Sequence, residues 1–286
     1  MVDGLLCFGF GFTAQELARQ NPTWQVWGTS RDPEKISQTS KQVHPLKFDG
    51  RSQPDGLEHI QDQISHILLS IPPGEDGDPV LQVLYDQIGK FSNLKWIGYL
   101  STTGVYGDLA GGTATEETPL NPSGKRGQRR VDAEQAWQQL AAEKNLPLHI
   151  FRLPGIYGPG RNQLVSLQKG KAHRIVKKGH MFSRIHVTDI AKILTASMLK
   201  PNPGRIYNVS DDLPAPPQDV VTYAAELLGI DPPPLQDFET ADMTPMARSF
   251  YSDNKRICNR RIKEELGVSL TYPDYKKGLK ALSEGA

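Results

Sequence analysis

The sequence predicts an α/β protein built as a doubly wound parallel sheet with a smaller C-terminal lobe. Short apolar runs alternate with helix-like segments through the first half, which is typical of a parallel sheet wrapped by helices. A glycine-rich turn follows the first of these runs. Proline then becomes frequent late in the chain, since ten of the 22 prolines lie at or beyond Pro201, and this favours a separate lobe of short elements.

Each expected element has its own local signal. The run at residues 66–71 is largely apolar, as expected of a strand buried on both faces. Asp32-Pro33 and Asp78-Pro79 each open a helix, because Asp caps well and Pro suits the first helical position. The expected strands are residues 5–9, 24–29, 43–48, 66–71, 96–101 and 149–153. Further helices are expected at residues 13–19, 131–142, 218–228 and 255–266.

We therefore assign residues 1–155 and 184–210 to the larger domain, and residues 156–183 and 211–286 to the smaller lobe. The formal net charge of +1 favours neither a nucleic-acid partner nor a membrane partner. No apolar run approaches the ~18 residues of a membrane helix. The first six residues lack the basic region and the full apolar core of a secretory signal.

The metal-ligating residues are sparse. Cys7 and Cys258 have no metal-ligand spacing, and the seven histidines form no paired motif. The sequence predicts no metal site and a reduced, cytoplasmic protein. We expect a monomer or a homodimer.

The turn after the first strand has the pattern GxGxxA. Gly9 allows the tight turn, Gly11 lets the backbone approach a pyrophosphate, and the small Ala14 lets helix and strand pack closely. The helix N-terminus then offers N–H groups to the phosphates. This pattern predicts a Rossmann domain whose phosphate loop comprises Gly9, Phe10, Gly11, Phe12 and Thr13. The alternative is a turn that needs glycine for its geometry alone.

The end of the second strand favours NADP over NAD. Arg31 can form a forked contact with a 2′-phosphate, and Ser30 can add a hydroxyl. Asp32 is the competing residue, as a ligand of the 2′-OH of NAD, although its place before Pro33 suits a helix cap. Asp49 is a candidate contact for the adenine amino group, with a role as a turn residue before Gly50 as the alternative.

Several segments occur in the order of a known family. They are Ser101-Thr102-Thr103-Gly104-Val105-Tyr106-Gly107, residues 152–160 (RLPGIYGPG), residues 184–191 (RIHVTDIA) and Tyr207-Asn208-Val209. On these motifs the chain resembles the NAD-dependent epimerase/dehydratase branch of the extended short-chain dehydrogenases/reductases, and its atypical members most of all. The resemblance implies that Thr102 orients a substrate oxygen. It also implies that the cofactor is lined by Ser70, Ile71, Pro72, Ser101, Pro154, Gly155 and Ile156.

The departures from the family concern its acid–base residues. Aligned on Glu134, Arg126 stands at the position of the family's Tyr and Arg130 at that of its Lys. A guanidinium stays protonated, so it cannot transfer a proton, but it can hold an anion. We expect Arg126 to hold an anion and Arg130 to bond the nicotinamide ribose. The alternative is that both only coat a helix.

Three nearby side chains have simpler expected roles, and one stretch of chain is basic. Tyr106 and Tyr157 are the remaining phenols, for which packing is the expected role, and His186 is expected to bond a nearby backbone group. The stretch from residue 161 to 184 contains no acidic residue and five further basic ones, Lys169, Lys171, Arg174, Lys177 and Lys178. It predicts a small anionic ligand, unless it is a solvated loop.

Two functions fit these observations. The first is an NADP-dependent oxidoreductase or epimerase-like enzyme acting on a small anionic substrate without the usual Tyr-x-x-x-Lys pair. The second is a non-catalytic NADP-binding sensor or scaffold. The missing Tyr favours the sensor, whereas the retained Thr102, the RLPGIYGPG segment and residues 186–189 favour an enzyme.

Overall fold

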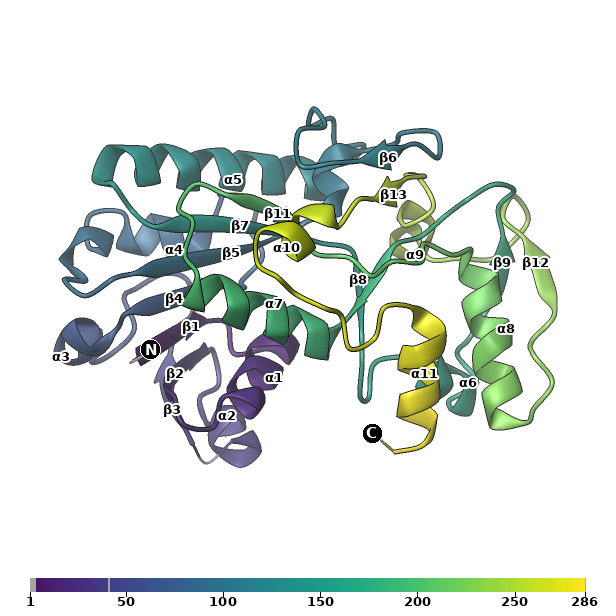
Figure 1. Ribbon diagram of the computed structural model, residues 1–286, viewed down its shortest axis with the longest axis horizontal. Helices are drawn as coiled ribbons and strands as arrows, with labels where there is room; N and C mark the ends of the chain where they lie inside the picture. The colour runs from purple at the N-terminus through teal and green to yellow at the C-terminus, as the bar shows by residue number, and fades with distance from the viewer. Residues whose placement is uncertain (1–3, 41, 286) are drawn as a thin grey trace.

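The computed structural model describes residues 4–40 and 42–285 of the chain. Its centre is a seven-stranded parallel sheet in the order β11-β7-β5-β4-β1-β2-β3 (Figure 1). The strands are β1 (Gly4–Phe8), β2 (Gln25–Ser30), β3 (Val43–Lys47), β4 (His66–Leu69), β5 (Trp96–Thr102), β7 (Leu148–Leu153) and β11 (Ile206–Asn208). The six strands expected in the first half are therefore confirmed, to within two residues at each end.

Helices cover both faces of this sheet. They are α1 (Phe12–Gln20), α2 (Glu34–Thr39), α3 (Leu57–Ile60), α4 (Pro79–Leu84), α5 (Lys125–Lys144) and α7 (Val187–Leu199). Alternate residues of β1 enter two different cores: Leu5 and Cys7 pack in the cluster that includes α1 and α7, and Leu6 and Phe8 in the cluster that includes α4 and α5. This two-sided burial explains why the first strand reads as a continuous apolar run.

The smaller lobe has its own core. Its elements are β8 (Gly155–Tyr157), α6 (Gln163–Gln168), β9 (Arg174–Val176), β10 (Arg184–His186), α8 (Pro217–Leu228), β12 (Leu235–Asp237), α9 (Pro245–Ser249) and α11 (Tyr275–Ser283). A compact apolar cluster joins α6, α8 and α11, and includes Leu164, Ala224 and Leu279. Figure 1 shows most of these elements to one side of the central sheet.

The prediction of one helix at residues 255–266 is wrong. The segment begins as strand β13 (Arg256–Ile257), which pairs with β6 (Thr113–Ala114), and only then forms the short helix α10 (Arg260–Glu264). Pairing with a strand more than 140 residues earlier overrides the helical pattern, because Arg256 N–H donates to the backbone of Gly112 and Cys258 N–H to that of Ala114.

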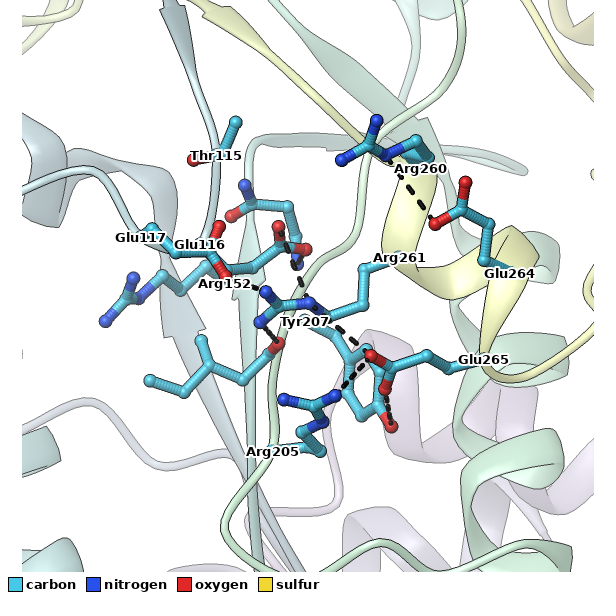
Figure 2. A network of polar contacts seen from close by, with 12 residues as sticks. Thr115, Glu116, Glu117, Arg152, Arg205, Tyr207, Arg260, Arg261, Glu264 and Glu265 are labelled. Atoms are coloured by element: carbon cyan, nitrogen blue, oxygen red, sulfur yellow. Dashed lines mark hydrogen bonds and ion pairs between the residues drawn. The ribbon is translucent and has the colours of Figure 1, made fainter.

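Helix α10 packs on the larger domain. Ile262, Leu266 and Val268 belong to the same core as Leu5. A group of polar contacts fixes α10 from outside, centred on Arg261, which pairs with Glu116, Glu117 and Glu265 (Figure 2). The predicted domain boundaries stay a prediction, but residues 260–268 share a core with the larger domain rather than with α8 and α11.

The expected Asp32 cap is also wrong. Helix α2 has Pro33 at its N-cap position without any side-chain cap, and Asp32 instead lies 3.3 Å from the ammonium of Lys35. At the start of α4 the same dipeptide behaves as predicted, since Asp78 accepts the N–H groups of Val80 and Leu81. None of the described helices is long and apolar enough to span a bilayer.

The remaining elements are short. Three 3-10 turns, Gln61–Gln63, Ile88–Lys90 and η3 (Thr103–Tyr106), lie on connections between strands and helices. The last of them directly follows β5 and carries Tyr106 into the interior. It thereby shapes the edge at which the candidate site lies.

Candidate functional site

The candidate site lies at the carboxyl edge of the parallel sheet. The loops after β1, β2, β4, β5 and β7 all leave from this edge, and β1 lies between β2 and β4. From β1 the strand order proceeds through β2 and β3 on one side and through β4, β5 and β7 on the other. In open α/β sheets, ligands bind at the carboxyl edge where the strand order reverses in this way. Almost every predicted site residue stands on one of these loops, so the topology brings them to one edge.

The two glycines of the phosphate loop have different reasons to be glycine. Gly9 has φ of +87°, and a Cβ there would lie 2.8 Å from the Ser70 hydroxyl and 2.9 Å from Ile71. A Cβ on Gly11 would meet nothing within 4 Å. Gly9 is therefore required by the fold, whereas Gly11 leaves space open beside the N-terminus of α1, which has no side-chain cap. This arrangement fits a phosphate group.

The rest of the loop is held by β2. Thr29 accepts the Gly9 N–H through its hydroxyl and the Phe10 N–H through its carbonyl, each at 2.9 Å. Phe10 is buried and packs against Gly28, and Thr13 is buried behind the loop. Sequence reasoning missed Thr29, because a threonine in a strand gives no local sign of a contact with a preceding loop.

A segment of the smaller lobe reaches the phosphate loop. A Cβ on Gly158 would lie 3.2 Å from the Phe12 ring, and the Arg161 guanidinium lies 5.7 Å from the centre of that ring. The exposed Arg161 thus stands beside the helix N-terminus predicted to bind pyrophosphate. No pattern in the sequence singled it out.

The ends of β2 and β3 carry the residues predicted to select the cofactor. Arg31 is exposed and has no ion pair among the described residues, while Asp32 is engaged by Lys35. The Ser30 hydroxyl accepts the Asp32 N–H at 3.1 Å. Asp49 is exposed and accepts the Arg51 N–H at 2.8 Å, a bond that lowers the pKa of its carboxyl.

The loop after β4 borders the phosphate loop. The Ser70 hydroxyl donates to the carbonyls of Phe8 and Gly9, and the Ile71 side chain lies against Gly9. Pro72 is exposed. The loop then reaches α5 through Glu75, whose carboxylate lies 2.6 Å from Arg129.

A buried polar network forms the floor of the site beneath β5. Arg152 on β7 and Glu134 on α5 form an ion pair of 2.6 Å, with side chains only 3% and 1% exposed. The Ser101 hydroxyl donates to the same carboxylate. Arg152 also donates to the Tyr106 hydroxyl, which in turn donates to Asn208 at 2.7 Å. We call these five residues the floor network.

Within the floor network, two candidate side chains are already engaged. The hydroxyl of Ser101 is committed to Glu134, so only its backbone faces the cofactor edge. The phenol of Tyr106 is buried and bonded on both sides, and burial raises its pKa. Thr102 is half-buried, and its hydroxyl accepts the Gly104 N–H at 3.1 Å as the cap of η3.

The two arginines at the start of α5 are placed differently. Arg126 is exposed and has no polar partner among the described residues. Arg130 is half-buried and donates to the Leu100 carbonyl at 2.7 Å and to the Tyr99 hydroxyl at 3.2 Å. Arg130 is therefore tied to β5 beside Thr102, while Arg126 extends from the first turn into solvent. Their expected roles stay predictions.

Pro154, Gly155 and Ile156 lie partly exposed where β7 passes into β8. β8 pairs in parallel with β10, and the Phe182 ring lies against Gly155. Tyr157 is buried, donates to the Asp274 carbonyl and packs against Gly278, so it faces the smaller lobe.

The expected structural role of His186 is confirmed. Its Nδ1 accepts the Thr188 N–H at 3.2 Å and caps α7, and burial lowers the pKa of the ring to about 4. A neutral ring is required for this bond, because a protonated Nδ1 could not accept it.

The basic stretch does not form one patch. Arg174 donates to the Pro233 carbonyl, and Lys177 donates to the Tyr251 carbonyl at 2.6 Å. Lys169, Lys171 and Lys178 are exposed. Over the described residues, no group of three His, Cys, Asp or Glu side chains stands where it could bind a metal ion.

Residues 82–210, from α4 through β11, match the NAD dependent epimerase/dehydratase family. The chain therefore contains a segment of the NAD-dependent epimerase/dehydratase family, which spans somewhat less than half of its length. The resemblance stated from the motifs around Thr102, Arg152 and His186 is thereby confirmed.

Three known proteins illustrate what the chain is similar to. A functionally unknown conserved protein from Silicibacter pomeroyi is 51% identical, with a TM-score of 0.90 over 99% of this chain and 98% of that one. The dTDP-glucose 4,6-dehydratase of Bacillus anthracis in complex with NAD is 19% identical, with a TM-score of 0.79 over 99% and 96%. At that identity the likeness concerns the fold alone.

Protein YeeZ of Escherichia coli strain K12 is 34% identical over 182 residues. The match covers 62% of this chain and spans 58% of the length of YeeZ.

Proposed function

We propose that the protein binds NADP(H) and acts as an oxidoreductase or epimerase-like enzyme on a small anionic substrate. The family match at residues 82–210 supports a nicotinamide dinucleotide as the cofactor. The open space at Gly11 and the uncapped start of α1 carry the proposal, because both suit a pyrophosphate approaching the backbone.

The preference for NADP rests on Arg31. Its guanidinium has no described ion-pair partner, while the neighbouring Asp32 is engaged by Lys35. A free guanidinium suits a 2′-phosphate, and an engaged carboxylate is less available to a 2′-OH. The Ser30 hydroxyl lies next to both.

Bound cofactor would supply or accept hydride, and the residues of the chain would position the reactants. The Thr102 hydroxyl would orient a substrate oxygen, and Arg130 would hold the ribose beside β5. Arg126 would attract an anion at the mouth of the site. None of these arginines can move a proton, because a guanidinium stays charged.

Calorimetric titration tests the cofactor proposal. Wild-type protein should bind NADPH more tightly than NADH. Arg31→Ala should weaken NADPH binding by about 1.5–3 kcal/mol, the value of a charge-assisted hydrogen bond, and leave NADH nearly unchanged. Asp32→Ala is the matched control and should not weaken NADPH binding. Equal wild-type affinities for the two cofactors would refute the preference.

One observation favours a non-catalytic NADP-binding sensor as the second candidate. The two phenols that the sequence placed near the cleft have engaged hydroxyls, Tyr106 in the floor network and Tyr157 on the Asp274 carbonyl. Single-turnover absorbance of NADPH with a panel of carboxylates and sugar phosphates separates the two. Consumption of NADPH supports the enzyme, and cofactor binding without consumption supports the sensor.

A further inference from the structure

A second set of polar groups lies outside the floor network, and one of its members, His180, is buried without hydrogen-bond partners among the described residues. His180, in the turn before β10, is 2% exposed, yet neither ring nitrogen hydrogen-bonds to any described residue. Burying polar atoms without hydrogen bonds costs free energy. The two buried nitrogens of His180 therefore lower the stability of the fold unless a ligand hydrogen-bonds to them.

Arg184 is buried without a balancing charge. It is 9% exposed, and its Nη1 donates to the carbonyls of Phe182 and Ala215. Among the described carboxylates, none lies close enough to form an ion pair with it. Asp211 acts on it at longer range, but burial raises the pKa of Asp211 to about 8, so that carboxyl is largely uncharged at neutral pH. A buried cation of this kind favours an anionic partner.

Tyr251 joins His180 to Arg184. Its ring lies 5.2 Å from that of His180, and its hydroxyl has no described hydrogen-bond partner. Burial raises the pKa of the phenol and the charge of Arg184 opposes this rise, so the two groups lie within electrostatic range. Tyr251 therefore packs on the His180 ring and lies within electrostatic range of the Arg184 guanidinium.

Asn254 fixes the turn that carries His180. Its side chain accepts the Met181 N–H at 2.9 Å and donates to the Gly179 carbonyl at 3.0 Å, which clamps the turn that carries His180. Its backbone N–H donates to Asp108 at 2.7 Å. Asp108 follows η3, so the cluster is connected directly to the edge that carries Thr102.

We propose that His180, Arg184 and Tyr251 form the substrate-binding subsite, and that it takes a small carboxylate that also carries hydroxyl groups. The planar fork of Arg184 matches a carboxylate, and the Tyr251 hydroxyl adds a donor. A neutral His180 offers one donor and one acceptor, and the acceptor requires a hydroxyl on the ligand. The inference deepens the proposed function and rests on it.

D-gluconate, titrated calorimetrically into protein with NADP present, is the test ligand. We expect it to bind at least tenfold more tightly than acetate, which lacks the hydroxyls, and than glucose, which lacks the charge. Tighter binding of glucose 6-phosphate than of gluconate would overturn the choice of a carboxylate. Binding of none of the four would overturn the subsite.

Substitutions separate a binding role from a structural one. His180→Phe keeps a ring against Tyr251 and removes both unpartnered nitrogens, so we expect gluconate affinity to fall at least tenfold while the melting temperature without ligand stays equal or rises. Tyr251→Phe should also lower the affinity. Tyr223→Phe, on α8 of the same lobe, is the matched control and should not change it.

A lower melting temperature for His180→Phe with unchanged gluconate affinity would show that the imidazole is structural and would overturn the subsite. NADP affinity is measured in the same preparations and should be unchanged in all variants. If wild-type protein binds no NADP, the cofactor proposal fails on its own, and gluconate is titrated without cofactor under the same criteria.

Discussion

Arg152 and Arg184 are both buried arginines, yet their surroundings differ. Arg152 forms an ion pair with Glu134 and hydrogen-bonds Tyr106, so its charge and its donors are satisfied by the floor network. Arg184 donates hydrogen bonds to two carbonyls, packs on the rings of Phe182 and Tyr275 and forms no ion pair with a described residue, and the nearby His180 has no hydrogen bond to a described residue. The comparison indicates that the first cluster serves stability, whereas the second is arranged for a ligand.

The largest expected effect is in the floor network. Glu134→Ala leaves Arg152 buried and unpaired, which should lower the free energy of unfolding by about 3–5 kcal/mol in urea denaturation. Glu75→Ala removes an acid that also pairs with an arginine but is 85% exposed, so it should cost less than about 1 kcal/mol. Similar losses of unfolding free energy in the two variants would contradict the distinction between the buried ion pair and the exposed one.

The pH dependence of stability reports on His149, and stability at pH 7 compares His149 with His180. His149 is fully buried, accepts the Asn202 N–H at 2.9 Å, and has a pKa lowered by burial to about 4. The unfolded chain takes up a proton near pH 6.5, so this contribution is fully present above about pH 6.5 and is lost as the pH falls toward 4, by up to about 3 kcal/mol.

His149→Phe should therefore show a shallower loss of stability between pH 7 and 4.5 than the wild type in urea denaturation. It should also destabilise the protein at pH 7, whereas His180→Phe should not. Identical slopes for the wild type and His149→Phe would contradict the assignment of this titration to His149.

Substitutions at Gly9 and Gly11 should change stability less than Glu134→Ala does, and they separate an effect on folding from an effect on cofactor binding. Gly9→Ala forces a side chain into positive φ and against Ser70, so it should lower the free energy of unfolding by about 1–3 kcal/mol. A Cβ at Gly11 meets no protein atom within 4 Å, so Gly11→Val should change stability by less than about 0.5 kcal/mol yet abolish NADPH binding. Retained binding in Gly11→Val would mean that no ligand approaches there.

The smallest expected effect is at Tyr106. Tyr106→Phe removes the bonds to Arg152 and Asn208 and should cost about 1 kcal/mol in denaturation. Because the hydroxyl is already engaged in the floor, NADPH affinity and any turnover should be unchanged. Loss of turnover in a variant that still folds would show that Tyr106 takes part in catalysis rather than only in the floor network.

The sequence predicted the parts of the fold that have local causes. The strands, the phosphate loop and the Asp78 cap follow from apolar runs, glycine spacing and a capping residue, all of which act within a few residues. The helix at residues 255–266 was wrong because β13 pairs with β6, and no local pattern reports such a partner. The Asp32 cap failed because Pro33, not Asp32, occupies the N-cap position of α2.

In the candidate site, too, the sequence predicted the features that have local causes and missed those that depend on tertiary packing. Gly9 to Thr13 gather at one sheet edge as expected, and the confirmed role of His186 depends on a residue two positions away. The basic stretch predicted an anion site by composition, but Arg174 and Lys177 are engaged elsewhere. The unbalanced charge is on Arg184, at the end of that stretch, and only the packing around it makes this visible.

The return of α10 to the larger domain has a consequence for synthesis of the chain. Leu5 and Val268 share one core, so this core lacks part of its wall until nearly the whole chain has left the ribosome. Strands β1 to β7 emerge long before residues 262–268, which complete the cover on one face of the sheet. During this interval apolar surface is open to other chains, and folding depends on contacts of very long sequence separation. A nascent chain stalled before residue 260 would therefore be a natural client for chaperones.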